Sequence, residues 1–163
     1  MSAPNTLTWS DELVLGDART DTTHQEFIDL VNATTAATSE EKLSAYRSLL
    51  DHTVEHFAQE ERWMQACGVQ PDFCHFGQHN SVLEVMREVE RRALTGELAY
   101  IDSMIEALVE WFPMHAQSMD TALVAFLLEQ GFDTATESFR DGAGNAAAAL
   151  PSCAEHGSGP SCA

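Results

Sequence analysis

The sequence predicts an all-α fold, an antiparallel up-down-up-down four-helix bundle with an irregular N-terminal arm and a disordered C-terminal tail. Apolar residues recur at spacings of three and four along four stretches, which is the pattern of amphipathic helices. Short turns marked by glycine or proline separate these stretches, and short turns make consecutive helices antiparallel neighbours. We expect the arm at residues 1–18, the bundle at 19–132, and a short extension followed by the tail at 133–163.

Length and charge limit the possible partners. A chain of 163 residues, 44% of them hydrophobic, can form one domain with a sizeable core. Its 26 acidic and 8 basic residues give a formal net charge of -18, which would repel nucleic acid and anionic membranes. The sequence lacks the apolar run of about 18 residues that spans a membrane, and it lacks the pattern of a signal peptide. We therefore expect a cytoplasmic protein without membrane insertion.

The arm and the first helix differ in the spacing of their apolar residues. Trp9, Leu13 and Leu15 are scattered along an irregular segment and should pack it onto the core. From Asp17 to about Ala37 the spacing becomes that of a helix. The inner face of this first helix carries His24, Phe27, Ile28 and Val31.

Capping signals and glycines mark the ends of the next two helices. Thr38 and Glu41 have the spacing of a capping box, so the second helix should begin there, and Gly68 should end it. The turn at residues 71–72 contains proline and aspartate and precedes the third helix, which should end at residues 95–96.

The fourth predicted helix is the longest and runs from about residue 97 to 130, with Gly131 as its stop. Pro113 lies inside it and should kink it, because proline removes a backbone donor. After Phe132 the composition shifts to alanine, glycine, serine and aspartate. From about residue 141 we expect the disordered tail, because this composition offers too little apolar surface to bury.

Each predicted helix carries a histidine or a carboxylate in the middle of its apolar face. Burying a polar group without a partner costs about 1 to 3 kcal/mol, and an ionised carboxylate costs more. The arginines fall off the inner faces, so they cannot pair with these carboxylates. A bound metal would supply the missing partner. The seven candidate metal ligands are His24, His56, Glu60, His75, His79, His115 and Asp120.

The number of these residues predicts two metal ions. Imidazole with carboxylate suits iron, zinc, copper or nickel, and seven ligands exceed the four of a closed tetrahedral site. Glu60 and Asp120 are natural bridges, with the histidines divided three and two. His115 and Asp120 are five residues apart, so a regular helix would turn them about 140° from each other. A one-residue π-bulge would bring both side chains inward.

With these residues in place, the chain resembles the hemerythrins, specifically the single-domain bacterial ones. The resemblance covers roughly residues 7–132. It begins with LTWSDELVLG and continues through DTTHQEFIDLVN, HFAQEERWM, HFGQH and WFPMHAQSMD, one segment for each predicted helix. The ordered set H, HxxxE, HxxxH, HxxxxD is highly specific, and this sequence fills every position.

The resemblance implies a non-haem di-iron centre that binds O2 reversibly, for oxygen storage, delivery or sensing, in a protein that is not an enzyme. O2 would bind at an open coordination position of the second iron. A further protein could accept O2 or electrons. By resemblance, His75, His79 and His115 hold one iron, His24 and His56 hold the second, and Glu60, Asp120 and an oxo or hydroxo group bridge the two.

Apolar residues near the predicted ligands should exclude water from the bound O2. Trp111 precedes His115 by four residues and therefore lies on the same helix face. A role in the core and a role in the pocket are both consistent with this position. The expected apolar lining consists of Phe27, Ile28, Leu108, Trp111 and Phe112.

Several other interpretations remain open at this stage. The protein could be a di-iron enzyme that reduces O2, peroxide or nitric oxide, or a signalling input module. His52 forms a second His-x-x-x-His pair with His56, but we expect it outside the centre because Thr53 fits the inner face better. The cysteines should be free thiols. A structural zinc could instead use Cys67, Cys74, His75 and His79, and the tail residues Cys153, His156 and Cys162 should have no specific role.

Overall fold

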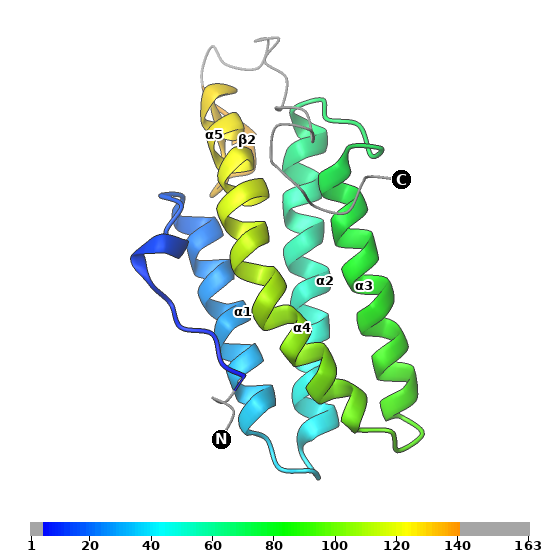
Figure 1. The fold of residues 1–163 in the computed structure, drawn as a ribbon. Coiled ribbons are helices and arrows are strands. Elements are labelled where there is room, and N and C mark those ends of the chain that lie inside the picture. Colours follow the sequence, from blue (N-terminus) through cyan, green and yellow to red (C-terminus); the bar gives the residue numbers. More distant parts are fainter. Residues whose placement is uncertain (1–4, 141–163) are drawn as a thin grey trace.

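A computed structural model of the chain describes residues 5–140 and shows the predicted four-helix bundle (Figure 1). The last helix is one continuous rod in which a π-helical turn interrupts regular α-helix. Adjacent helices run in opposite directions, which confirms the up-down-up-down arrangement. The helices are α1 (Ala18–Ala36), α2 (Lys42–Ala66), α3 (Cys74–Ala93) and α4 (Ala99–His115), which continues through η2 (Ala116–Asp120) into α5 (Thr121–Glu129).

The four rods form a closed ring around a common interior. α1 packs against α2 and α4, and α3 packs against the same two helices. Fully buried side chains such as Tyr46, Leu49 and Ile101 fill one end of this interior. Every rod therefore presents one face to the same central space, which is the arrangement that a shared site requires.

The predicted glycine stops lie at the helix ends. Gly68 follows α2 with φ 87°, and Gly131 follows α5 with φ 67°. A side chain disfavours this left-handed backbone conformation, so glycine is the residue that ends a helix there with least strain. At the other end of the first helix, the Asp17 side chain accepts a hydrogen bond of 2.9 Å from the Thr20 N–H.

The start of α2 differs from the capping-box prediction. The helix begins at Lys42, after a turn over residues 39–41. Glu41 does reach back to the Thr38 N–H, at 3.4 Å, but the Thr38 hydroxyl donates to the Glu41 carboxylate at 3.0 Å. The hydroxyl therefore does not cap a backbone N–H of the helix, and residues 38–41 form a closed turn before it.

The N-terminal arm packs along α1, as Figure 1 shows. Leu7 and Leu13 are buried in the main core, and Trp9 is half-buried against it. The Asn32 side chain of α1 holds the arm through two hydrogen bonds with the Leu7 backbone, at 2.8 and 2.9 Å. Leu15 instead donates its backbone N–H to Asp21, at 2.8 Å. A short 3-10 turn, η1 (Asp11–Leu13), lies within the arm.

A small hairpin that was not predicted follows α5. Strands β1 (Phe132–Asp133) and β2 (Ser138–Phe139) pair antiparallel, with Phe132 opposite Phe139. Phe132 is buried in a second apolar cluster at the end of the bundle, and Glu137 in the hairpin loop accepts hydrogen bonds from Arg62 and Trp63. The expected short extension therefore has structure of its own. The predicted disordered tail, at residues 141–163, lies outside the described residues.

Three further observations complete the fold. Within residues 5–140, helices that are long and apolar enough to cross a membrane are absent.

Cys67 is a free thiol, as expected, but Cys74 is disulfide-bonded, so the prediction of free thiols is wrong for Cys74. Cysteine spacing alone carries no information about such a pairing.

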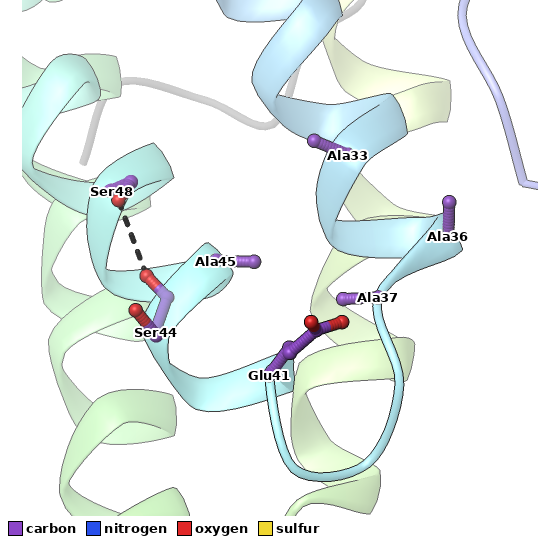
Figure 2. Close-up of a pocket in the computed structure, with 7 residues that line it drawn as sticks. All are labelled: Ala33, Ala36, Ala37, Glu41, Ser44, Ala45 and Ser48. Atoms are coloured by element: carbon purple, nitrogen blue, oxygen red, sulfur yellow. Dashed lines mark hydrogen bonds between the residues drawn. The ribbon is translucent and has the colours of Figure 1, made fainter.

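An open groove of about 430 Å³ lies where α1 ends and α2 begins (Figure 2). None of the seven candidate metal ligands lines it, so it is separate from the site described next. Its lining residues are mostly small: Ala33, Ala36, Ala37, Glu41, Ser44, Ala45 and Ser48.

Candidate metal centre

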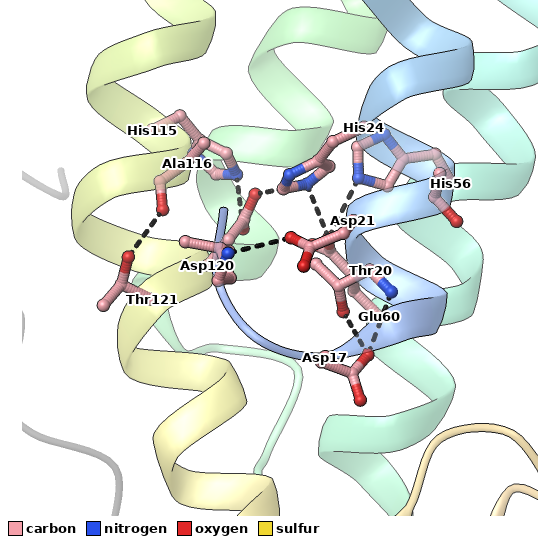
Figure 3. Close-up of polar contacts among 12 residues, drawn as sticks. Asp17, Thr20, Asp21, His24, His56, Glu60, His115, Ala116, Asp120 and Thr121 are labelled. Atoms are coloured by element: carbon pink, nitrogen blue, oxygen red, sulfur yellow. Dashed lines mark hydrogen bonds and ion pairs between the residues drawn. The ribbon is translucent and has the colours of Figure 1, made fainter. Parts of the chain in front are cut away.

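All seven predicted ligands lie together in the interior of the bundle. α1 contributes one histidine, α2 a histidine and a glutamate, α3 two histidines, and the α4–η2 rod a histidine and an aspartate. Each is at most 3% exposed, which excludes bulk water from the cluster. Figure 3 shows His24 and His56 pointing toward the same space as Glu60 and Asp120.

The π-helical turn η2 places His115 and Asp120 on the same side of their helix. The Thr121 N–H bonds to the Ala116 carbonyl five residues earlier, and the Thr121 hydroxyl donates to the same oxygen at 3.0 Å. As a result, His115 Nε2 lies 3.1 Å from Asp120 Oδ1. The predicted π-bulge is therefore confirmed, and the helix continues through Pro113 before it.

Three imidazoles form one half of the cluster with one oxygen of each carboxylate. Glu60 Oε2 lies 3.4 Å from His75 Nε2 and 3.3 Å from His79 Nε2. Asp120 Oδ1 lies 3.1 Å from the Nε2 atoms of both His75 and His115. Within this group, one ligand atom from each residue lies within 4.8 Å of all the others.

The other half uses the remaining oxygens of the same two carboxylates. Glu60 Oε1 lies 2.9 Å from His56 Nε2 and 3.8 Å from His24 Nε2, and Asp120 Oδ2 lies 3.1 Å from His24 Nε2. Each carboxylate thus turns one oxygen toward the three-imidazole group and the other toward the two-imidazole group. This is the arrangement of a bridging carboxylate between two cations.

Most of these inward atoms are close to one another without forming hydrogen bonds. In the described residues, hydrogen-bond partners are lacking for the Nε2 atoms of His24, His75, His79 and His115 and for both Asp120 oxygens. Separations of 3.1 to 3.8 Å without hydrogen-bond geometry mean that these atoms point toward common centres. Leaving them unpaired is costly, and two cations would satisfy them. The donor set of imidazole and carboxylate suits iron, zinc, copper or nickel.

The electrostatics of the metal-free cluster follow from burial and from mutual contact. Burial opposes ionisation of Glu60 and Asp120, but the facing imidazoles hold the pKa of each carboxyl well below its usual value. Burial likewise opposes protonation of His24 and His75, yet their contacts with the two carboxylates raise the pKa to about 10 for His24 and about 9 for His75. Burial lowers the pKa of His115 to about 4.

The predicted apolar residues divide between the two halves. The Phe112 ring lies edge-on to His24, at 5.1 Å between centroids, and Phe27 lies 4.7 Å from Phe112 and 6.2 Å from His56. Trp111 is half-buried and stacks on His115 at 4.3 Å, which places it with the three-imidazole group. Ile28 and Leu108 are buried in the surrounding core.

Some predicted alternatives do not match this geometry. His52 lies outside both ligand groups, as expected, with its Nε2 3.2 Å from the Thr23 carbonyl oxygen. Neither ligand group includes Cys67 or Cys74, so a shared zinc site with His75 and His79 gains no support from the described residues.

Sequence reasoning missed three residues that contact the imidazoles from outside. Glu61 lies beside His79, Gln78 beside His115, and the Phe57 ring stacks on His79. Each directly follows or precedes a predicted ligand in the sequence. That adjacency was the available signal, but on a helix it normally places the neighbour on a different face.

Comparison with known proteins agrees with this site. The sequence profile of the hemerythrin HHE cation binding domain matches residues 15–127, which include all seven clustered residues. The chain belongs to the hemerythrin family. It is 40% identical over 129 residues to a bacteriohemerythrin of Ralstonia nicotianae (strain ATCC BAA-1114 / GMI1000), a match that covers 79% of this chain and 94% of that protein. This hemerythrin therefore carries a cation-binding domain whose buried cluster can hold metal.

Proposed function

We propose that this hemerythrin holds two non-haem iron ions, bridged by an oxo or hydroxo group, and binds O2 reversibly. The observation that carries the proposal is the division of Glu60 and Asp120 between two imidazole groups, with one oxygen of each carboxylate toward each group. His75, His79 and His115 would hold one ion, and His24 and His56 the other. The name of the Ralstonia relative, a bacteriohemerythrin, supports the proposed binding of O2.

The unequal ligand sets support a specific place for O2. Three imidazoles and two carboxylate oxygens give five protein ligands on one side, and two imidazoles with two oxygens give four on the other. A bridging oxygen would bring these totals to six and five. The open position would therefore lie on the side of His24 and His56. When bound, the ferrous pair supplies the two electrons that O2 accepts.

The burial of the two-imidazole group favours reversible O2 binding over enzymatic reduction of O2. Phe27 and Phe112 are each 1% exposed, and both lie against the two-imidazole group. They would exclude the water and protons that otherwise release reduced oxygen. An imidazole-rich donor set also stabilises highly oxidised iron less than a carboxylate-rich one. We therefore propose a cytoplasmic role in oxygen storage, delivery or sensing, with a protein partner that accepts O2 or electrons.

Optical spectra of the anaerobically reduced protein test the proposal. Admission of air should produce an absorption band from iron and bound O2, and removal of O2 should abolish that band over repeated cycles. Steady consumption of a reductant in air, without an accumulating O2-bound form, would instead indicate an enzyme that reduces O2.

A further inference from the structure

The two halves of the cluster differ in what supports their imidazoles from outside. In the three-imidazole group, His79 Nδ1 lies 3.2 Å from Glu61 Oε1, and His115 Nδ1 lies 3.0 Å from Gln78 Oε1. Carboxylate and amide oxygens accept hydrogen bonds, so each Nδ1 donates. In the neutral form of either ring, this hydrogen bond holds the single proton on Nδ1, and the lone pair of Nε2 faces the centre.

Stacked aromatic rings hold the same two imidazoles in place. Phe57 stacks on His79 at 3.9 Å with an angle of 3° between the ring planes, and Trp111 stacks on His115 at 4.3 Å with an angle of 23°. Both rings are therefore fixed by an outer hydrogen bond and a parallel aromatic neighbour before any metal binds.

The two-imidazole group lacks this support. In the described residues, the Nδ1 atoms of His24 and His56 have no hydrogen-bond partner, although both side chains are buried. His56 Nε2 lies 2.9 Å from Glu60 Oε1, where it must donate, so its proton occupies the atom that would bind a metal. The contact of Phe112 with His24 is edge-on.

An outer acceptor that holds the Nδ1 proton both orients a metal-ligating histidine and makes its Nε2 a stronger donor. We propose that this hemerythrin loads its two metals in order, and that Glu61 and Gln78 make the three-imidazole site the tighter one, which fills first. The two-imidazole site, whose rings must reorganise, fills second. This inference rests on the proposed di-iron function.

Glu61 is the better of the two residues for a test. Its side chain is 27% exposed, so its replacement leaves no buried charge behind, and its carboxylate is a stronger acceptor than the Gln78 amide. Glu55 offers a matched control, because it is an exposed carboxylate on the same helix and lies outside both ligand groups.

Anaerobic calorimetric titration of the metal-free protein with Fe²⁺ measures both binding steps. The wild type should show two steps of different affinity. Glu61→Ala should weaken the tighter step by about 10- to 100-fold, the usual effect of losing such an outer hydrogen bond, and should leave the weaker step unchanged. Glu61→Gln retains an acceptor oxygen and should fall between Glu61→Ala and the wild type. Gln78→Ala should also weaken only the tighter step.

Two further variants show which site each binding step belongs to and whether the weakening is specific to Glu61. His24→Ala should remove the weaker step and keep the tighter one, and Glu55→Ala should change neither. The inference is overturned if Glu61→Ala leaves the tighter step unchanged, weakens both steps equally, or acts no differently from Glu55→Ala. Loss of the tighter step in His24→Ala overturns it as well. A wild type that binds fewer than two Fe²⁺ ions overturns the proposed function instead.

Discussion

Asp120 lies five residues after His115, and its Oδ1 is nevertheless 3.1 Å from His115 Nε2. The turn of π-helix between them makes this possible, because its wider turn absorbs one extra residue. Both carboxylate oxygens of Asp120 are thereby placed between the two imidazole groups. The position of this one side chain decides whether the cluster can hold two ions.

Asp120→Asn should lower iron binding from two ions per chain to at most one. The amide has nearly the same shape but only one acceptor oxygen and no charge, so it cannot bridge two cations. Iron analysis of the protein loaded anaerobically measures the ratio, and circular dichroism should show an unchanged helix content. Two irons per chain in this variant would show that Asp120 is not a bridge.

His56→Ala should abolish loading of the two-imidazole site, whereas His52→Ala should leave it intact. The two histidines are one turn apart on α2, but only the His56 Nε2 lies in a ligand group, while His52 bonds to the Thr23 carbonyl. Iron content of the purified variants measures the difference. The reverse result, with iron lost only in His52→Ala, would mean that α2 is assigned wrongly.

Metal loading at pH 7 should release about two protons per chain from His24 and His75, in addition to those lost by the water that would form the bridging group. Burial opposes protonation of His24 and His75, but contact with Asp120 and Glu60 raises the pKa of His24 to about 10 and of His75 to about 9. Both rings are thus protonated in the metal-free protein and must lose these protons to bind metal. A pH indicator in weakly buffered solution measures the release, which should diminish toward pH 10.

The same two histidines should make the metal-free protein less stable at high pH. Their folded-state pKa values lie above the unfolded value near 6.5. Their stabilising contribution is therefore complete below about pH 6.5 and is lost as the pH rises through 9 and 10. Urea unfolding of the metal-free protein at pH 6.5 and pH 10 measures this, and equal free energies of unfolding would contradict it.

Phe132→Ala should lower the free energy of unfolding by about 3 to 5 kcal/mol. Phe132 is 3% exposed and packs in the second apolar cluster, whereas its cross-strand partner Phe139 is 36% exposed. Phe139→Ala is the matched control and should cost clearly less. Urea unfolding at constant pH compares the two, and equal losses would contradict the prediction, because burial in the second apolar cluster would then not increase the contribution of Phe132.

The parts of the structure that follow a helical repeat could be predicted from the sequence. The spacing of His75 and His79 fixes a helix face, and the five-residue spacing of His115 and Asp120 is inconsistent with any regular helix, so it indicated the π-helical turn. Gly68 and Gly131 marked helix ends because few other residues adopt their backbone conformation.

Features that depend on tertiary contact could not be predicted in this way. Phe132 and Phe139 form a hairpin because the end of the bundle offers Phe132 an apolar surface. The hydrogen bond between Glu61 and His79 joins α2 to α3, so the spacing of residues within one helix could not predict it. The spacing of Trp111 and His115 predicts that they share a helix face. It does not predict which half of the cluster Trp111 contacts, because that depends on how the helices pack.

Anomalous X-ray scattering at the iron absorption edge, from crystals of the iron-loaded protein, tests the central claim most directly. The account predicts two iron peaks on either side of the Glu60 and Asp120 carboxylates, one among His75, His79 and His115 and the other between His24 and His56. A single peak, or two peaks that do not share these carboxylates, would contradict it.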